Sequence, residues 1–169
     1  MRWDYPAIEG VQADLLLVTH EHLDHNGVGA IGEVLAVAAE HDDAAGTERG
    51  PNTLFAFTLG GRRVAQRGLA EVAEVGDAQA RALGTVDVLF VPVGGSATIG
   101  ADQAADVAAR LGAPIVVPMH YRTERIDFLE PVDDFAQRAA RVERLRASAF
   151  ELDDLPHGDG PLVVVPAAP

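Results

Sequence analysis

The sequence contains no cysteine, and this absence excludes both disulfide bonds and thiolate metal sites. Any bound metal would therefore have to be held by histidine and carboxylate side chains. Aromatic residues are also scarce, at 5% of the chain, whereas 48% of all residues are hydrophobic. We expect a soluble globular protein whose core consists largely of small aliphatic side chains.

Long apolar runs are missing as well. No segment approaches the ~18 consecutive apolar residues that a membrane helix requires. The first residues also lack the basic region and following apolar run of a signal peptide. These features predict a cytoplasmic protein that does not interact with membranes.

Positive charge is in short supply, because 13 Lys and Arg residues stand against 26 Asp and Glu, giving a net charge of −13 at pH 7. Such a field repels phosphate backbones and predicts that the protein does not bind nucleic acid. Arg138, Arg141, Arg144 and Arg146 do cluster, but Glu143 lies among them on one predicted helix. We interpret them as a solvated helix face. The expected partner is a small-molecule substrate, and a homo-oligomer is an open alternative.

The length of 169 residues predicts a single domain over residues 1–169. Apolar runs and alternating patterns predict strands at residues 13–19, 33–39, 53–59, 62–65, 86–93, 115–118 and 162–165. Helices are predicted at 77–83, 102–111 and 133–148, with Asp77 as the N-cap of the first. A hairpin region followed by strand–helix–strand alternation indicates an α/β fold.

Three residues with chemical or conformational interest follow directly after predicted strands, namely His20, Gly94 and His120. Open α/β sheets bind ligands at the carboxyl ends of their strands. We therefore expect the functional site at that edge of the sheet.

The most specific pattern is Thr-His-Glu-His-Leu-Asp-His at residues 19–25. In an extended segment alternate side chains point the same way, so His20 and His22 can share one cation. A turn after this pair can bring Asp24 and His25 to a second cation. Neutral imidazole and carboxylate groups suit Zn²⁺, and also Mn²⁺ or Fe. The alternative is a histidine-rich surface loop, which the position at a strand end disfavours.

This run resembles the metallo-β-lactamase superfamily signature, Thr-His-x-His-x-Asp-His after an apolar strand. Other stretches resemble the short bacterial branch that includes ascorbate-6-phosphate lactonase-like proteins. They occur in the order of that branch: His41-Asp42 with Gly50-Pro51-Asn52, then Pro92-Val93-Gly94-Gly95, then Pro118-Met119-His120-Tyr121. The similarity covers roughly residues 10 to 125.

The resemblance implies a metallo-β-lactamase-like αββα four-layer sandwich that lacks part of its N-terminal hairpin. It also implies two zinc sites, of which one or both are filled. One would be bound by His20, His22 and His41, and the other by Asp24, His25 and His120. Taken alone, His41 and His120 would be interpreted as structural, and only their order and neighbours make them ligands. His157 matches nothing in the family and is expected to be a loop residue.

One expected ligand is missing. The family carries a strand followed by Gly-Asp, whose carboxylate bridges the two metals, but Leu69 stands where this Asp would be. Asp77 is a possible substitute, although we favour its role as a helix cap. Segments absent from the chain and true deletions both explain the gap. Without a bridging carboxylate, one of the two metals should bind more weakly.

The resulting hypothesis is a metal-dependent hydrolase that uses a metal-bound hydroxide on a small ester, lactone or phosphoester. Asp24 would be a ligand and a catalytic proton acceptor. The alternatives are a catalytically degenerate metal-binding member of the same fold, or an oxidoreductase using Fe in the same cage. The loop at residues 94–98 would either offer N–H groups to an anionic substrate or form a tight turn before a helix. Tyr121 and Asn52 are candidates for lining the pocket.

Overall fold

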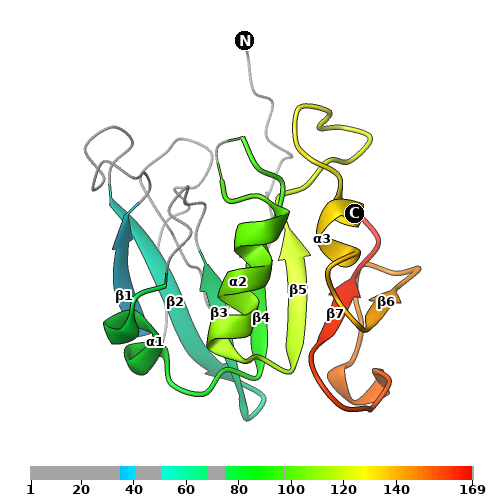
Figure 1. Cartoon of the computed structure of the whole chain (residues 1–169). Coiled ribbons are helices and arrows are strands. Elements are labelled where there is room, and N and C mark those ends of the chain that lie inside the picture. The colour runs from blue at the N-terminus through cyan, green and yellow to red at the C-terminus, as the bar shows by residue number, and fades with distance from the viewer. Residues whose placement is uncertain (1–34, 41–50, 68–74, 97, 169) are drawn as a thin grey trace, which may run out of the picture.

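The computed structural model describes residues 35–40, 51–67, 75–96 and 98–168, and for 35–40 and 51–52 it describes the backbone alone. The strands are β1 Leu35–Glu40, β2 Pro51–Leu59, β3 Arg62–Arg67, β4 Val88–Pro92, β5 Ile115–Met119, β6 Val142–Arg144 and β7 Leu162–Val165. The helices are α1 Asp77–Leu83, α2 Ala101–Leu111, α3 Val132–Ala136 and the short 3₁₀ helix η1 Leu152–Asp154 (Figure 1).

All seven strands form one sheet in the order β1-β2-β3-β4-β5-β7-β6. The first three pair antiparallel, whereas β3, β4, β5, β7 and β6 pair parallel along the sheet. Gly60 and Gly61 join β2 to β3 with positive φ at both positions, as a two-residue hairpin with the twist of its strands requires. The predicted hairpin and α/β class are confirmed.

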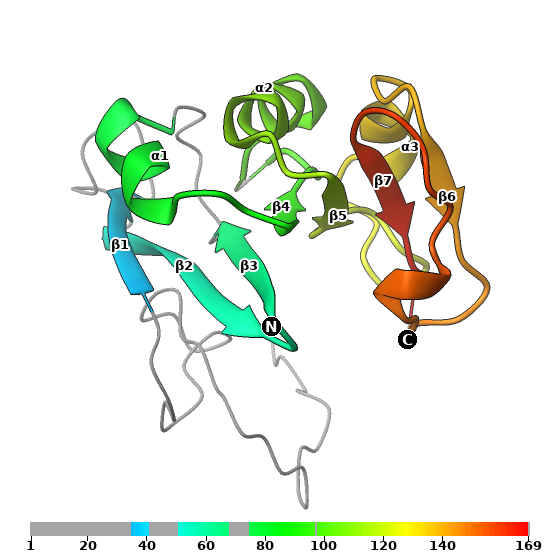
Figure 2. The same ribbon diagram turned by 90° about the horizontal axis from the view of Figure 1, so that it is seen from below.

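The sheet has two differently covered faces, as the alternation along β4 shows. Leu89 and Val91 are fully buried on the face that α2 covers, together with Val107 of that helix. Val88 and Phe90 point to the opposite face. Figure 2 shows α1, α2 and α3 on one side of the sheet. On the other side, Leu155, just after η1, is buried in the second apolar cluster.

The resemblance implied an αββα sandwich of four layers. The described residues form two of these layers, one sheet and the helices that cover one of its faces (Figure 2). The predicted strand at residues 13–19 lies outside the described part of the chain. All the other predicted strands are present, with ends shifted by a few residues. No helix within the described residues is long and apolar enough to cross a membrane.

The predicted helix at residues 133–148 is wrong. Only Val132–Ala136 is helical, where Phe135 and Ala136 are buried, and the chain then forms the edge strand β6. Each β6 residue pairs with β7, in a parallel register that sets Val142 beside Val163. Helix propensity is a weak local preference, and pairing with a sheet edge overrides it here.

The arginines of this segment consequently do not lie on one solvated helix face, and that interpretation is also wrong. Arg138 Nε donates to Asp102 Oδ1 of α2 over 2.5 Å. The guanidinium of Arg141 donates to three backbone carbonyls of the loop at residues 156–160. Arg144 forms an ion pair with a carboxylate of α3. Each of these three arginines joins separate elements.

Asp77 is not the N-cap of α1. Gly76 occupies that position and its N–H donates to Gln79 Oε1 over 3.0 Å, so Asp77 is the first helical residue. Its carboxylate forms an ion pair with Arg110 in the last turn of α2. A carboxylate in the first turn still stabilises the helix through the helix dipole.

Candidate functional site

The site begins where β4 and β5 end. These strands are neighbours and parallel, so the loops that follow them lie side by side at the carboxyl edge of the sheet (Figure 1). Val93 N–H donates to the carbonyl of Met119 over 3.0 Å, which carries the pairing one residue beyond β4. The structure therefore brings together Gly94 and His120, as the sequence predicted for two of its three strand ends.

His120 has a left-handed backbone with φ of 53°, an uncommon conformation for a residue with a side chain. The residue is half-buried, and the Nδ1 atom of its ring is buried. One side of the imidazole is therefore held inside the protein. Strained backbone of this kind persists only where the surrounding structure determines it, and it is concentrated at functional sites.

The described residues of the loop after β4 form a tight turn, as one of the two interpretations of residues 94–98 predicted. Gly95 has φ of 62°, and its carbonyl accepts the N–H and hydroxyl of Thr98 over 3.0 and 3.1 Å. Gly95 N–H donates to the carbonyl of Ile99 over 3.1 Å. The N–H groups of Gly95 and Thr98 are thus used within the loop, and they are not directed at a substrate.

An open hollow of about 420 Å³ adjoins His120 on the sheet face opposite the helices. We call it the carboxyl-edge hollow. Its volume is within the range of small-molecule sites, ~300–1,000 Å³. Tyr121, which the sequence predicted to line the pocket, lines this hollow. Asn52, the other predicted pocket residue, lies in β2, where the structure describes its backbone alone. The lining of the hollow includes Phe90, Val117, Met119, His120, Tyr121 and Ile126.

Tyr121 contributes the one ionisable hydroxyl of this lining. Burial raises the pKa of Tyr121 above its ordinary value, and the nearby positive charge of Arg144 opposes part of that rise. The hydroxyl therefore stays protonated at neutral pH.

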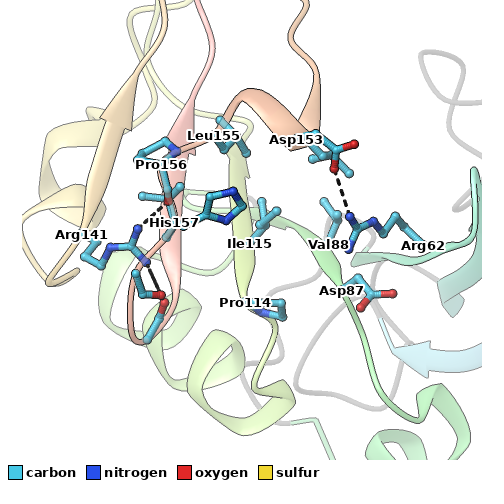
Figure 3. A pocket seen from close by; sticks show the side chains of 14 residues that line it. Arg62, Asp87, Val88, Pro114, Ile115, Arg141, Asp153, Leu155, Pro156 and His157 are labelled. Atoms are coloured by element: carbon cyan, nitrogen blue, oxygen red, sulfur yellow. Dashed lines mark hydrogen bonds and ion pairs between the residues drawn. The ribbon is translucent and has the colours of Figure 1, made fainter.

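A second hollow of about 200 Å³ lies at the opposite, amino edge of the sheet (Figure 3). The charged groups around it are bonded to neighbouring protein groups, since Arg62 pairs with Asp153 over 3.1 Å and Arg141 donates to loop carbonyls. His157 lines this hollow from an exposed loop, which confirms that it is a loop residue. Bonds of this kind tie loops to the base of the sheet.

Of the six predicted metal ligands, the structure describes His120 alone. The other five lie outside the described residues: His20, His22, Asp24, His25 and His41. Within the described ranges, no group of three or more histidine, aspartate or glutamate side chains could hold a metal. His120 is a half-buried imidazole at the carboxyl edge of the sheet, which is the edge where α/β proteins bind ligands. That placement suits a ligand.

Asp77 does not serve as a replacement for the bridging aspartate. It pairs with Arg110 at the end of α2, and α2 runs from the carboxyl edge, after β4, back to the amino edge, before β5. Asp77 thus lies towards the edge remote from His120.

Sequence reasoning missed Glu130. Its N–H donates to the carbonyl of Gly94 over 2.8 Å, and its own carbonyl accepts the N–H of Arg122 over 2.9 Å. Its carboxylate also lies against Gly95 and Gly100, close enough that a Cβ atom on Gly95 would meet it at 2.8 Å. No motif in the sequence marks this residue.

The chain is similar to known proteins in sequence and in fold. A family model described as a β-lactamase superfamily domain matches residues 27–120. A metal-dependent hydrolase of Methanoculleus marisnigri is 31% identical over 153 residues, covering 66% of this chain and 67% of the relative. A candidate zinc-dependent hydrolase of the metallo-β-lactamase superfamily from Thermotoga maritima superposes with a TM-score of 0.63 at 33% identity, covering 79% of this chain and 64% of that protein. The chain belongs to the metallo-β-lactamase superfamily.

This membership confirms the superfamily and the fold that the sequence motifs indicated. A metal-dependent hydrolase structure from Parabacteroides distasonis supports the fold alone, with a TM-score of 0.52 at 24% identity over 68% of this chain and 69% of that protein. The chain spans about two thirds of the length of these metallo-β-lactamase relatives. Several of its relatives are named metal-dependent hydrolases, and the ascorbate-lactonase-like branch stays a prediction.

Proposed function

We propose that this protein is a metal-dependent hydrolase of small ester, lactone or phosphoester substrates. The observation that carries the proposal is the position of His120, which follows β5 at the carboxyl edge beside the glycine turn of β4. Membership of a superfamily whose relatives here are metal-dependent hydrolases supplies the reaction class.

We propose the ligand sets that the sequence motifs imply. His20, His22 and His41 would bind one cation, while Asp24 and His25 would join His120 at the other. When bound in such a set, zinc, manganese or iron lowers the pKa of water and polarises the substrate oxygen. Zinc is the proposed metal, because imidazole and carboxylate ligands suit it.

The chain's own residues would orient the substrate. His120 would contribute its imidazole to the cation from its half-buried position at the carboxyl edge. Tyr121 lines the carboxyl-edge hollow and would help to shape the pocket around a substrate. Asp24 would accept a proton as the reaction intermediate breaks down.

We further propose that the partner is a small cytoplasmic molecule, not a nucleic acid or a membrane. A net charge of −13 disfavours polyanions. The carboxyl-edge hollow has the volume of a small-molecule site.

A second candidate is a degenerate, non-catalytic metal-binding member of the superfamily. It is favoured by Leu69 at the position of the bridging aspartate, and by Asp77 being paired with Arg110. Such a protein would bind one equivalent of metal or none, and would hydrolyse nothing.

Elemental analysis of the full chain, combined with a hydrolysis screen on lactones, carboxylic esters and phosphodiesters, tests both. The hydrolase should contain about two equivalents of metal, and His22→Ala should remove metal and hydrolysis together. His157→Ala is the matched control, because His157 is exposed at the amino edge. If His22→Ala keeps full hydrolysis, the proposed mechanism is wrong, and a metal-free chain that hydrolyses none of these substrates favours the second candidate.

A further inference from the structure

Gly94 and the turn that carries His120 approach each other closely at the carboxyl edge. A Cβ atom on Gly94 would lie well under 3.0 Å from the His120 carbonyl oxygen, a separation that real Cβ atoms essentially never show. It would also lie 3.1 Å from the carbonyl carbon of His120 and from Tyr121 Cα. All three atoms are backbone, so no side-chain rotation can relieve the contact.

The turn is closed from its other side by the segment Arg122–Glu130, which we call the closing arm. The ends of the arm are joined by the Arg122 N–H bond to the Glu130 carbonyl, and Arg122 Nε donates to the carbonyl of Leu129 over 2.7 Å. Leu129 is 1% exposed and anchors the arm in the protein. Glu130 N–H then donates to the Gly94 carbonyl over 2.8 Å.

His120 is thus held between two fixed pieces of backbone. Gly94 packs directly against its carbonyl, and the closing arm that begins two residues later is bonded back to the same glycine. The left-handed φ of 53° at His120 is maintained by these contacts.

We infer that Gly94 is a positioning residue for His120, and that the closing arm acts with it. This inference rests on the proposed function only in making His120 a metal ligand. The distances between a metal and its ligands are held within about ±0.2 Å. A Cβ atom on Gly94 would push the His120 backbone away by several times that tolerance, because it would lie well under 3.0 Å from the carbonyl oxygen. A methyl group at this position should therefore remove His120 from its place without removing its side chain.

The experiment compares Gly94→Ala with Gly112→Ala in the full chain. Gly112 ends α2 with φ of 64° and has nothing within 4 Å of an added Cβ, so its variant suffers backbone strain far from His120. Two readouts are taken: the imidazole resonances of His120 in the metal-free protein, and the affinity and visible spectrum with Co²⁺ alone. His120→Ala provides the reference for complete loss of this ligand.

Gly94→Ala should shift the His120 resonances and reproduce the weakened Co²⁺ binding and altered spectrum of His120→Ala. Gly112→Ala should retain the wild-type resonances and spectrum although its stability falls. Unchanged His120 resonances in a folded Gly94→Ala chain would overturn the inference. Shifted resonances combined with a Co²⁺ affinity that His120→Ala leaves unchanged would instead overturn the proposed function at this ligand.

Arg122→Ala keeps the inference testable if Gly94→Ala fails to fold. It deletes the 2.7 Å bond within the arm from an exposed residue. A net hydrogen bond of ordinary strength predicts about a 3- to 10-fold loss of Co²⁺ affinity, with smaller shifts of the His120 resonances. Wild-type affinity together with wild-type resonances in Arg122→Ala would contradict a positioning role for the arm.

Discussion

Tyr121, at the carboxyl edge of the sheet, has a pKa that the fold raises. Burial raises its pKa, and Arg144 opposes part of the rise. We predict that absorbance titration of the folded chain finds Tyr121 ionising above the ordinary range. The sequence has two tyrosines, so the difference between the wild type and Tyr121→Phe isolates this one. Arg144→Gln should move the midpoint higher still, because it removes the opposing charge.

The sign of the linked stability change follows from the direction of this pKa shift. Between the pKa of unfolded tyrosine and the higher folded pKa, the unfolded chain has lost its proton while the folded chain keeps it. The contribution of Tyr121 is therefore complete below the unfolded pKa and is lost as pH rises through the folded value. A Tyr121 midpoint at or below the ordinary value would show that the hydroxyl is not buried as described.

At single positions, the sequence predicts chemistry better than conformation. The motifs placed Gly94 and His120 at the ends of two strands, and the structure confirms both. The left-handed backbone of His120 was not predictable, because it depends on contacts with Gly94 and Glu130 that are distant in sequence. Local patterns contain no signal for such contacts.

Among the elements, the segment from residue 132 to 148 shows where local pattern fails. Its Ala, Arg, Glu and Leu content favours helix, yet β6 pairs with β7 and only five residues are helical. The edge of β7 has free backbone hydrogen-bonding groups that a parallel strand can pair with. A local sequence pattern does not show that such an edge will lie beside the segment. The hairpin of β2 and β3 was predictable, since Gly60-Gly61 determines its turn locally.

The role of Arg141 yields a prediction for the connection between β6 and β7. Its guanidinium donates to the carbonyls of Pro156, Gly158 and Gly160 over 2.6, 3.0 and 3.1 Å. Arg141→Ala removes these bonds, so the backbone amides of residues 157–160 and of Leu162 should exchange hydrogen faster, by about 10-fold if the loss is ~1.4 kcal/mol. Hydrogen exchange followed by mass spectrometry measures this change.

Arg146→Ala is the matched control for the β6–β7 connection. Arg146 is an exposed arginine five residues further along the chain. Exchange in the 156–162 loop should stay at the wild-type rate in this variant. Equal acceleration in both variants would mean that the loop responds to lost charge and not to the carbonyl contacts of Arg141.

For the whole molecule, the sequence motifs identified the superfamily because their order along the chain is specific, and the family match over residues 27–120 confirms it. The hairpin and the strand–helix alternation predicted the α/β class, whereas the sheet order, with β6 at its edge, was not predicted. The complete ligand set stays a prediction, since five of its six residues lie outside the described part of the chain. Fold and site edge were therefore predictable, while coordination depends on side-chain geometry that motifs do not specify.

Metal binding should couple the site to the stability of the whole chain. A cation that binds the folded state alone stabilises it by about 2.7 kcal/mol at 100 times its dissociation constant, which corresponds to a rise in Tm of about 5–10 °C at this chain length. We expect zinc to raise the Tm of the wild type in thermal scans, and a chelator to reverse the rise. His22→Ala and His120→Ala should each show a smaller rise, because each lacks one proposed ligand, whereas His157→Ala should match the wild type. A wild-type Tm that zinc leaves unchanged would contradict zinc as the metal of the folded chain and would favour the second, degenerate candidate.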